Sequence, residues 1–242
     1  MRDYDLVVIG GGNSFGLLTE MAKAGESVAL IEADLLGGTC PNRGCIPSKL
    51  LIGYAEVANA VRGAHRFHID ATLHDIDGPA LLAETFGQTR KTDAKIEGAL
   101  HENVTLYRGR GRFVGPREVE VNGERLRGKR VLIATGGRPR RPDIPGLAGT
   151  PYWTSNDLFQ MDDLPKSIVI VGGGCIGLEM GSFLHGVGVD VTVVHRASTL
   201  MDAADEDARA VLTEAFTSRV PTRLDSEVTQ VSHDGREFEL QD

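Results

Sequence analysis

A pattern of strand, glycine-rich turn, helix and strand occurs twice in this chain, and it constrains the fold more than any other feature. The first copy is DLVVIGGGNSFGLLTEMAKAGESVALIEAD, with apolar strands expected at 5–9 and 27–31 and a helix that ends near Ala24. The second is SIVIVGGGCIGLEMGSFLHGVGVDVTVVHR, with strands expected at 167–171 and 190–194 and a helix that ends near Val187. Two such copies predict an α/β fold with two Rossmann-like dinucleotide-binding units.

The glycines of each turn have the positions that nucleotide binding requires. Gly10 and Gly172 permit a tight turn after the strand, and Gly12 and Gly174 let the backbone approach a pyrophosphate. The helix that follows offers N–H groups and a partial positive charge to the phosphates. The alternative is that these glycines only end the strands of a doubly wound sheet that binds no ligand.

The third glycine of the motif distinguishes the two copies. Gly177 is in register in the second copy, whereas Phe15 takes this position in the first and Gly16 follows it. We therefore expect the first loop to be one residue longer, or its helix and strand to be further apart. Gly16 is taken as the corresponding cofactor-binding glycine.

The residue at the end of each second strand indicates which nucleotide fits. Glu32 can accept hydrogen bonds from a ribose 2′-OH, so the first unit suits FAD or NAD. In the second unit His195 takes this place and Arg196 follows, and an arginine there can accommodate the 2′-phosphate of NADPH. Arg196 could also be a solvated surface charge.

Composition excludes several classes of protein. The 242 residues are 41% hydrophobic and carry a net charge of −8, without the basic cluster typical of a nucleic-acid-binding protein. The apolar runs have the length of strands, so we expect no membrane span. Residues 1–9 lead directly into a strand without a secretory leader, and three cysteines are too few for a disulfide framework. We therefore expect a cytoplasmic protein.

Two of the three cysteines lie five residues apart in GGTCPNRGCIPSK, residues 37–49. Five residues of ideal helix rise about 7.5 Å, and bridged cysteines need Cα atoms within about 7 Å. Cys40 and Cys45 can therefore bridge only if Cys40 lies in a loop or a distorted turn, which the surrounding glycines and prolines permit. We expect Cys45 near a helix start, where free N–H groups stabilise a thiolate.

Three interpretations of this pair remain open from the residues alone. A zinc site needs about four ligands, and no histidine shares the spacing, so we expect no metal. The pair could also be inert and buried, or it could be a redox disulfide beside a bound nucleotide. Cys175, in the second glycine turn, is expected to be a small packed residue.

The motif GGTCPNRGCIPSK resembles the active-site motif of the group I flavoprotein disulfide reductases, which include glutathione, mycothione and mercuric reductases and dihydrolipoamide dehydrogenase. The resemblance extends to the first glycine turn, to ATGGRP at 134–139 and to GLEMGS with Glu179. It implies binding of FAD by the first unit and of NAD(P)H by the second. The FAD contacts that it implies include Gly38, Thr39, Thr135 and Gly136.

The resemblance also implies a chain of electron transfer. NAD(P)H reduces FAD, and the reduced flavin opens a Cys40–Cys45 disulfide. Cys45 is the thiol next to the flavin, and Cys40 exchanges with a small-molecule disulfide substrate. Lys49 and Glu179 would pair beside the flavin, although each could instead be an ordinary surface charge. Dihydrolipoamide dehydrogenase runs this transfer in reverse with NAD. Asp202 stands where the NADPH-preferring members of the family often carry a second arginine, so the resemblance weakens the preference for NADPH.

The predicted domains are an incomplete FAD-binding domain at 1–149, which carries the redox disulfide, and an incomplete NAD(P)-binding domain at 150–242. We expect three-layer β/β/α character in both Rossmann-like units. Family members are homodimers whose C-terminal dimerisation domain supplies a His–Glu pair, and we expect this domain to be absent here. We therefore expect weak FAD retention and little turnover. The alternatives are a nucleotide-binding fragment without catalysis and an NAD(P)H diaphorase without a disulfide substrate.

The remaining sequence predicts further elements. Helices are expected at 54–66 and 79–100, and strands at 104–107, 112–114, 119–121 and 130–134. Asn122-Gly123 is a two-residue hairpin turn.

Overall fold

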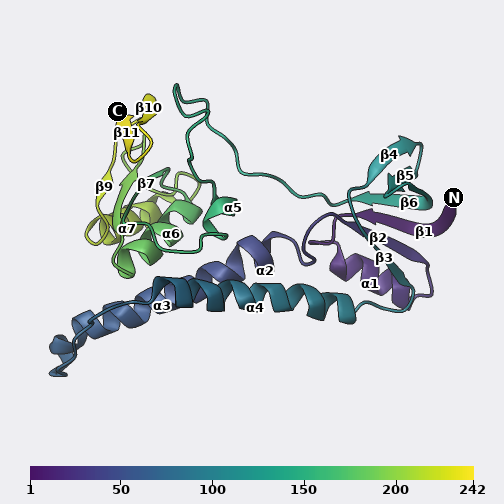
Figure 1. Ribbon diagram of the computed structural model, residues 1–242, viewed down its shortest axis with the longest axis horizontal. Helices are drawn as coiled ribbons and strands as arrows, with labels where there is room; N and C mark the ends of the chain where they lie inside the picture. Colours follow the sequence, from purple (N-terminus) through teal and green to yellow (C-terminus); the bar gives the residue numbers. More distant parts are fainter. The chain divides into compact units, whose positions relative to one another are not determined.

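The computed structural model describes residues 1–242 and contains two compact units (Figure 1). Unit 1 comprises Met1–Pro47 and Phe86–Arg138, and unit 2 comprises Ser48–Thr85 and Pro139–Asp242. The helices α3 (Cys45–Gly63) and α4 (Gly78–Gly98) each contribute residues to both units. Because these units are defined by contacts and not by ligands, the predicted cofactor domains 1–149 and 150–242 stay a prediction.

Unit 1 is built on a six-stranded mixed sheet in the order β3-β2-β1-β6-β5-β4. Strands β1, β2, β3 and β6 are parallel, whereas β4-β5 and β5-β6 pair antiparallel. The α/β prediction is confirmed. The elements of this unit are β1 (Arg2–Ile9), α1 (Phe15–Lys23), β2 (Val28–Glu32), α2 (Thr39–Arg43), β3 (Val104–Arg108), β4 (Arg112–Gly115), β5 (Glu118–Val121) and β6 (Glu124–Ile133).

The two faces of the parallel strands are covered by different layers. Successive side chains of a strand point to opposite faces. Val7 and Ile9 pack with Val119 and Leu126 of the antiparallel hairpin on one face. The alternate residues of β1 and β2 form a second cluster with Leu18 of α1 and with Ile96 of α4 on the other face. This arrangement confirms the predicted β/β/α layering for unit 1.

The longest strand, β6, was predicted only at its C-terminal half. Asn122 and Gly123 have φ values of +49° and +81°, as a type I′ hairpin turn requires, and they join β5 to β6. The first half of β6 pairs antiparallel with β5, while Leu126–Ile133 also pair parallel with β1. The prediction of a strand at 130–134 was wrong at its start, because the polar residues 124–129 lack an apolar run although the hairpin turn fixes their pairing.

Unit 2 contains a parallel sheet in the order β7-β8-β9 and a separate antiparallel pair, β10-β11. The predicted strands 167–171 and 190–194 are β7 and β8. Helix α3 is followed by a 3-10 turn, η1 (Ala64–Phe67). The elements of this unit are α5 (Ser155–Leu158), β7 (Ser167–Val171), α6 (Cys175–Gly186), β8 (Asp190–Val194), α7 (Glu206–Thr217), β9 (Thr222–Arg223), β10 (Gln230–His233) and β11 (Phe238–Gln241).

The core of unit 2 forms around α6. Phe183 and Leu184 of this helix are fully buried, as are Val191 and Val193 of β8. The other side of α6 lies close to α3, since a Cβ at Gly186 would be 2.5 Å from the Cβ of Ala55. None of the helices in the chain combines the length and the apolar character that a membrane crossing needs.

Strand β7 is an edge of its sheet, because β8 is its only neighbour. Val169 and Val171 on this strand are 42% and 52% exposed. Burial of apolar surface therefore stabilises β7 less than it stabilises the central strand β8.

We predict that Leu18→Ala lowers the free energy of unfolding by about 2–5 kcal/mol, since Leu18 is 1% exposed and its truncation leaves a cavity under the sheet. The matched control is Leu17→Ala on the same helix, where the side chain is 51% exposed and the expected change is within about 0.5 kcal/mol. Urea denaturation followed by circular dichroism measures both. Equal effects of the two substitutions would contradict the packing described for α1.

Candidate active site

The first glycine turn follows β1 and holds its backbone close to β6. Gly10 has a φ of +108°, and a Cβ there would lie 2.2 Å from the carbonyl oxygen of Ala134. Only glycine fits this turn. The Ser14 hydroxyl donates to the carbonyl of Gly10 at 2.7 Å, directly before α1 begins at Phe15. Ser14 was not identified from the sequence, although a serine directly before an expected helix is a signal for a side-chain-to-backbone bond.

The first glycine turn is longer than the second, as the sequence suggested, but by two residues instead of one. Helix α1 begins five residues after Gly10, whereas α6 begins three residues after Gly172. A Cβ at Gly177 would lie 2.2 Å from the carbonyl oxygen of Gly172, but a Cβ at Gly16 would have no neighbour within 4 Å. Close packing therefore requires Gly177 and does not require Gly16. A role of Gly16 in cofactor binding stays a prediction.

Glu32 lies at the end of β2, where its carboxylate contacts two backbone N–H groups. One oxygen accepts from Gly11 at 2.7 Å, and the other accepts from Asp34 at 2.7 Å. Each carboxylate oxygen has a second lone pair, so Glu32 can still accept a hydrogen bond from a ribose hydroxyl. The same carboxylate therefore orients the glycine turn and offers an acceptor beside it.

The cysteine loop is bonded to this first glycine turn. The N–H of Gly37 donates to the carbonyl of Gly11 at 2.7 Å. Gly38 has a φ of +69°, and a Cβ there would lie 2.8 Å from the Cα of Gly12. These two contacts place the cysteine loop directly beside the first glycine turn.

Asn42 connects the parts of the cysteine loop and was missed in the sequence. Its side-chain amide is buried and donates to the carbonyls of Leu36 and Gly38 at 2.9 and 2.8 Å. The Asn42 Oδ1 atom is buried without a hydrogen-bond partner. Asn42 lies between the two cysteines, so its two donated bonds fix the segment that carries Cys40. A polar residue inside a glycine- and proline-rich loop was the available signal.

A break between two helices separates the cysteines. Cys40 lies in the short helix α2, Gly44 interrupts the helical path with φ −153° and ψ −118°, and α3 begins at Cys45. The expected position of Cys45 at a helix start thus corresponds to the structure. Pro41 and Pro47 lie in the first turns of α2 and α3, where proline removes no helical hydrogen bond.

The structure holds Cys40 and Cys45 as thiols that interact with each other, and both are exposed. The hydrogen bond with the Cys45 side chain raises the pKa of the Cys40 thiol, and desolvation by neighbouring atoms raises it further. The N–H groups of Cys45 and Ile46 oppose this rise by bonding to the Cys40 sulfur. The first N–H groups of α3 are therefore directed at Cys40, whereas we had expected them to serve Cys45.

The end of β6 continues into Thr135 and Gly136, which the sequence placed at the FAD site. The N–H of Ala134 still donates to the carbonyl of Ile9, so the segment leaves the sheet next to the first glycine turn. Gly136 has a φ of +68°, and a Cβ there would have no neighbour within 4 Å. Thr39 is exposed at the start of α2. These residues leave open space around the turn, which fits a bound dinucleotide.

The second glycine turn has the same form in unit 2. Gly172 has a φ of +117°, and Gly174 is the N-cap residue of α6. A Cβ at Gly174 would have no neighbour within 4 Å, so the start of α6 is open on this side. Cys175, the first residue of α6, is exposed. The expectation of a packed Cys175 was wrong, because this position of the turn faces away from the core.

His195 follows β8 and is buried, with both ring nitrogens in hydrogen bonds. Its Nδ1 atom accepts the N–H of Gly173 at 3.1 Å, and its Nε2 atom lies 3.2 Å from the carboxylate of Asp202. This places His195 in the position that Glu32 occupies in unit 1. Arg196, the next residue, is exposed.

Lys49 and Glu179 form the ion pair that the resemblance implied. The Lys49 Nζ atom donates to the Glu179 carboxylate at 2.6 Å, and the side chains are 60% and 38% exposed. Lys49 lies on α3 and Glu179 lies on α6, so the pair joins two helices of unit 2. Exposed pairs contribute about 0–1 kcal/mol to stability, so we expect this contact to stabilise unit 2 only slightly.

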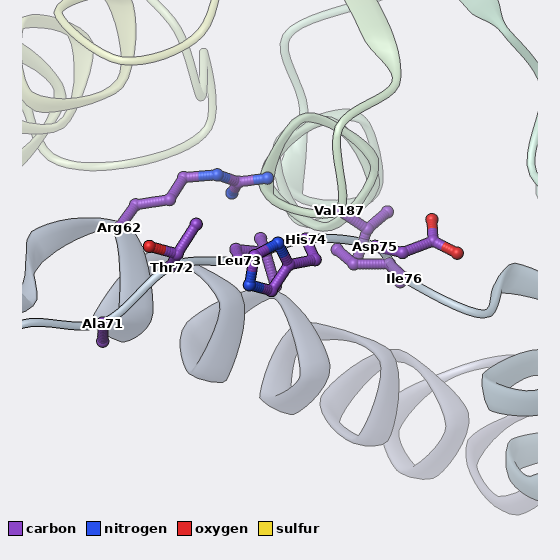
Figure 2. A pocket seen from close by; sticks show the side chains of 8 residues that line it. All are labelled: Arg62, Ala71, Thr72, Leu73, His74, Asp75, Ile76 and Val187. Atoms are coloured by element: carbon purple, nitrogen blue, oxygen red, sulfur yellow. The ribbon is translucent and has the colours of Figure 1, made fainter.

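A separate open cleft in unit 2 has none of the predicted site residues in its lining. Figure 2 shows the segment 71–76 on one side of it, with Arg62 and Val187 above. Arg62 donates to the carbonyl of Gly186 at 2.5 Å and to the side chain of Asn59 at 3.1 Å. Arg62 thus holds α3 to the end of α6. The structure brings together no group of three or more His, Cys, Asp or Glu side chains that could hold a metal ion.

Comparisons with known proteins identify relatives of the whole chain. Residues 4–242 match the family described as pyridine nucleotide-disulphide oxidoreductase. A dihydrolipoyl dehydrogenase of Thermus scotoductus is 36% identical over 89% of this chain and 47% of its own length. A mercuric reductase of Bacillus cereus is 32% identical over 90% of this chain and 35% of its own length.

The fold of this chain also resembles that of solved structures. The Cu(II) complex of the HOCl-induced flavoprotein disulfide reductase RclA from Escherichia coli has a TM-score of 0.86 and 27% identity. It is matched over 100% of this chain and 54% of its own length. The chain therefore spans about half or less of the length of these three relatives.

We predict that Cys45→Ala increases the rate at which iodoacetamide alkylates Cys40 at neutral pH. The hydrogen bond with Cys45 favours the protonated form of Cys40, so its loss lowers the pKa of Cys40 and increases the reactive thiolate. The backbone N–H donors remain in the variant. Peptide mass spectrometry across pH 6–10 measures the rate, with Cys175 as the internal control. An unchanged or slower profile for Cys40 would contradict the described contact.

Proposed function

Because the chain belongs to the pyridine nucleotide-disulphide oxidoreductase family, we propose that it transfers electrons between a pyridine nucleotide and a dithiol–disulfide couple formed by Cys40 and Cys45. The single observation that carries this proposal is the contact between the two thiols on a loop bonded to the first glycine turn. A redox pair must be close together, accessible and beside the cofactor, and this loop meets the first two conditions directly. The bond from Gly37 to Gly11 supports the third.

FAD fits unit 1 at the edge where the glycine turn, Glu32 and the cysteine loop meet. Gly12 and Gly38 leave no side chains at their close approach, Glu32 offers an acceptor for a ribose hydroxyl, and Gly136 leaves open space. When bound, FAD supplies the two electrons that reduce a disulfide, having received them from the pyridine nucleotide. The residues of this chain position the cofactor and handle the thiols.

The two cysteines have different tasks in this proposal. Two electrons and two protons convert the Cys40–Cys45 disulfide into two thiols. The Cys40 thiolate then attacks a small-molecule disulfide, which forms a mixed disulfide and releases one substrate thiol. The Cys45 thiolate attacks the Cys40 sulfur, releases the second thiol and restores the disulfide. Because the pKa of Cys40 is raised, its proton must be removed before it attacks.

The substrate we propose is a low-molecular-weight disulfide of the mycothione or glutathione type, or dihydrolipoamide in the reverse direction. The relatives named above include a dihydrolipoyl dehydrogenase and a mercuric reductase, so this family fold is compatible with more than one acceptor. A reducing compartment such as the cytoplasm suits a redox-active pair. The pyridine nucleotide would bind at Gly172, Gly174 and Gly177; Arg196 favours NADPH in that unit, and Asp202 opposes it.

We predict that NADH or NADPH, added anaerobically to the FAD-loaded chain, converts an air-oxidised Cys40–Cys45 disulfide into two alkylatable thiols. Mass spectrometry of iodoacetamide-treated peptides measures this, and Cys175 should be alkylated equally with and without nucleotide. In Cys45→Ser, the state of Cys40 should not respond to nucleotide, because its redox partner is missing.

Two outcomes would contradict this proposal. If the protein binds FAD and oxidises NAD(P)H while the pair does not change, the chain is a diaphorase without a disulfide substrate. If the protein binds no flavin and its thiols do not respond, it is a nucleotide-binding module.

We further predict that Lys49→Met lowers the rate of nucleotide-dependent thiol formation by roughly 10- to 100-fold, because a charge that positions the reacting groups is lost. The free energy of unfolding should change by less than about 1 kcal/mol, since the Lys49–Glu179 pair is exposed. Stopped-flow absorbance and urea denaturation measure the two quantities. Lys23→Met, which breaks an exposed pair with Glu20, is the control. A loss of stability with an unchanged rate would show that the pair is only structural.

A further inference from the structure

We propose that Asp202, held in place by His195, accepts the hydrogen bond of the adenosine ribose in unit 2, so that this unit binds NADH in preference to NADPH. The proposal rests on the pyridine nucleotide function proposed for unit 2. It identifies the residue that sets the choice of nucleotide, and it assigns His195 a positioning role.

The two units hold their glycine turns with different side chains. In unit 1, Glu32 accepts the N–H of Gly11. In unit 2, the Nδ1 atom of His195 accepts the N–H of Gly173. A carboxylate that accepts one such bond has further lone pairs for a ribose hydroxyl, but a neutral imidazole has a single acceptor nitrogen. His195 therefore has no acceptor left for the ribose.

Asp202 can supply the hydrogen-bond acceptor for the ribose that His195 lacks. Since Nδ1 of His195 accepts a bond, its Nε2 atom carries the proton and donates to the Asp202 carboxylate at 3.2 Å. The side chain of His195 is 9% exposed and that of Asp202 is 51% exposed. The imidazole is thus a buried support that anchors a carboxylate facing solvent, and the carboxylate keeps lone pairs for a ligand.

The backbone places Asp202 at the same glycine turn. The N–H of Met201 donates to the carbonyl of Gly173 at 2.9 Å. Gly173 is thereby bonded on its N–H side to His195 and on its carbonyl side to the residue before Asp202. Although Asp202 is distant from the strand end along the chain, these two bonds fix it beside the turn that would hold the pyrophosphate.

Charge favours a ribose hydroxyl over a phosphate at this position. A 2′-phosphate is an additional anion, and the Asp202 carboxylate repels it while Arg196 attracts it. The two opposite charges offset each other for a phosphate. A neutral hydroxyl suffers no repulsion and gains a charge-assisted hydrogen bond with Asp202. The arginine that favoured NADPH in the sequence is thus opposed by an acid that the structure anchors in the site.

Isothermal titration calorimetry with two fragments, ADP-ribose and 2′-phospho-ADP-ribose, tests this without flavin or turnover. The wild-type chain should bind ADP-ribose at least about tenfold more tightly. Asp202→Asn should weaken ADP-ribose binding by roughly 10- to 100-fold, the range for a hydrogen bond to a charged group, and should reduce or invert the preference. Asp190→Asn removes an exposed acid at the other end of β8 and should change neither affinity.

A rescue experiment separates the positioning role from a general effect on stability. The double variant H195E/D202N supplies unit 2 with the carboxylate arrangement of Glu32, and it should recover ADP-ribose affinity lost in Asp202→Asn. Asp202→Ala is a second variant in case Asp202→Asn folds poorly, and circular dichroism checks both.

Three outcomes would overturn the inference. If the wild-type chain binds 2′-phospho-ADP-ribose more tightly, or if Asp202→Asn leaves ADP-ribose affinity unchanged, the role of Asp202 is refuted while unit 2 remains a nucleotide-binding unit. If neither fragment binds, the nucleotide function proposed for unit 2 fails as well.

Discussion

The peptide groups of Gly11 hold together the three parts of the candidate flavin site. Its N–H is accepted by Glu32 at the end of β2, and its carbonyl is contacted by the N–H of Gly37 at the start of the cysteine loop. The N–H and the carbonyl of this single glycine thus join the nucleotide turn to the Glu32 carboxylate and to the backbone of the cysteine loop. The placement of the cysteine loop at the glycine turn therefore depends on the peptide groups of Gly11, together with the side chains of Glu32 and Asn42 that bond to the backbone.

The two units use different side chains to accept the same backbone N–H group of the glycine turn. Each turn leaves one N–H group that needs an acceptor at the end of the neighbouring strand. Glu32 provides a charged acceptor and His195 provides a neutral one. The neutral acceptor moves the negative charge outward to Asp202, where solvent reaches it. Repeated folds can therefore keep the hydrogen bond that holds the turn while they change the charge that a ligand meets.

Sequence patterns predicted the parts of the fold whose signals are local. Strands β7 and β8 are short apolar runs bounded by glycine or polar residues, and the hairpin at Asn122-Gly123 depends on two adjacent residues. The start of β6 was missed because its residues are polar and are held by pairing with β5. The exposure of Cys175 was missed because a small residue after a glycine turn has no pattern that shows which way it faces.

The candidate site was predictable to a similar degree. The resemblance implied roles for Cys40, Cys45, Lys49 and Glu179. The structure shows the contact of Cys40 with Cys45 and that of Lys49 with Glu179. Asn42 stands out as a polar residue in a glycine- and proline-rich loop, but its bonding partners could not be predicted, since they are carbonyl groups that only the folded loop presents. The same holds for the bond from His195 to Asp202, because nothing in the spacing shows that the chain returns to the glycine turn.

The edge position of β7 has a consequence for handling the protein. One side of this strand presents backbone N–H and C=O groups that no neighbouring strand uses, and Val169 and Val171 add exposed apolar surface beside them. Such an edge is a template for pairing with another chain. Strand β7 therefore offers a place where a second copy could add a strand, while the net charge of −8 favours dispersed molecules.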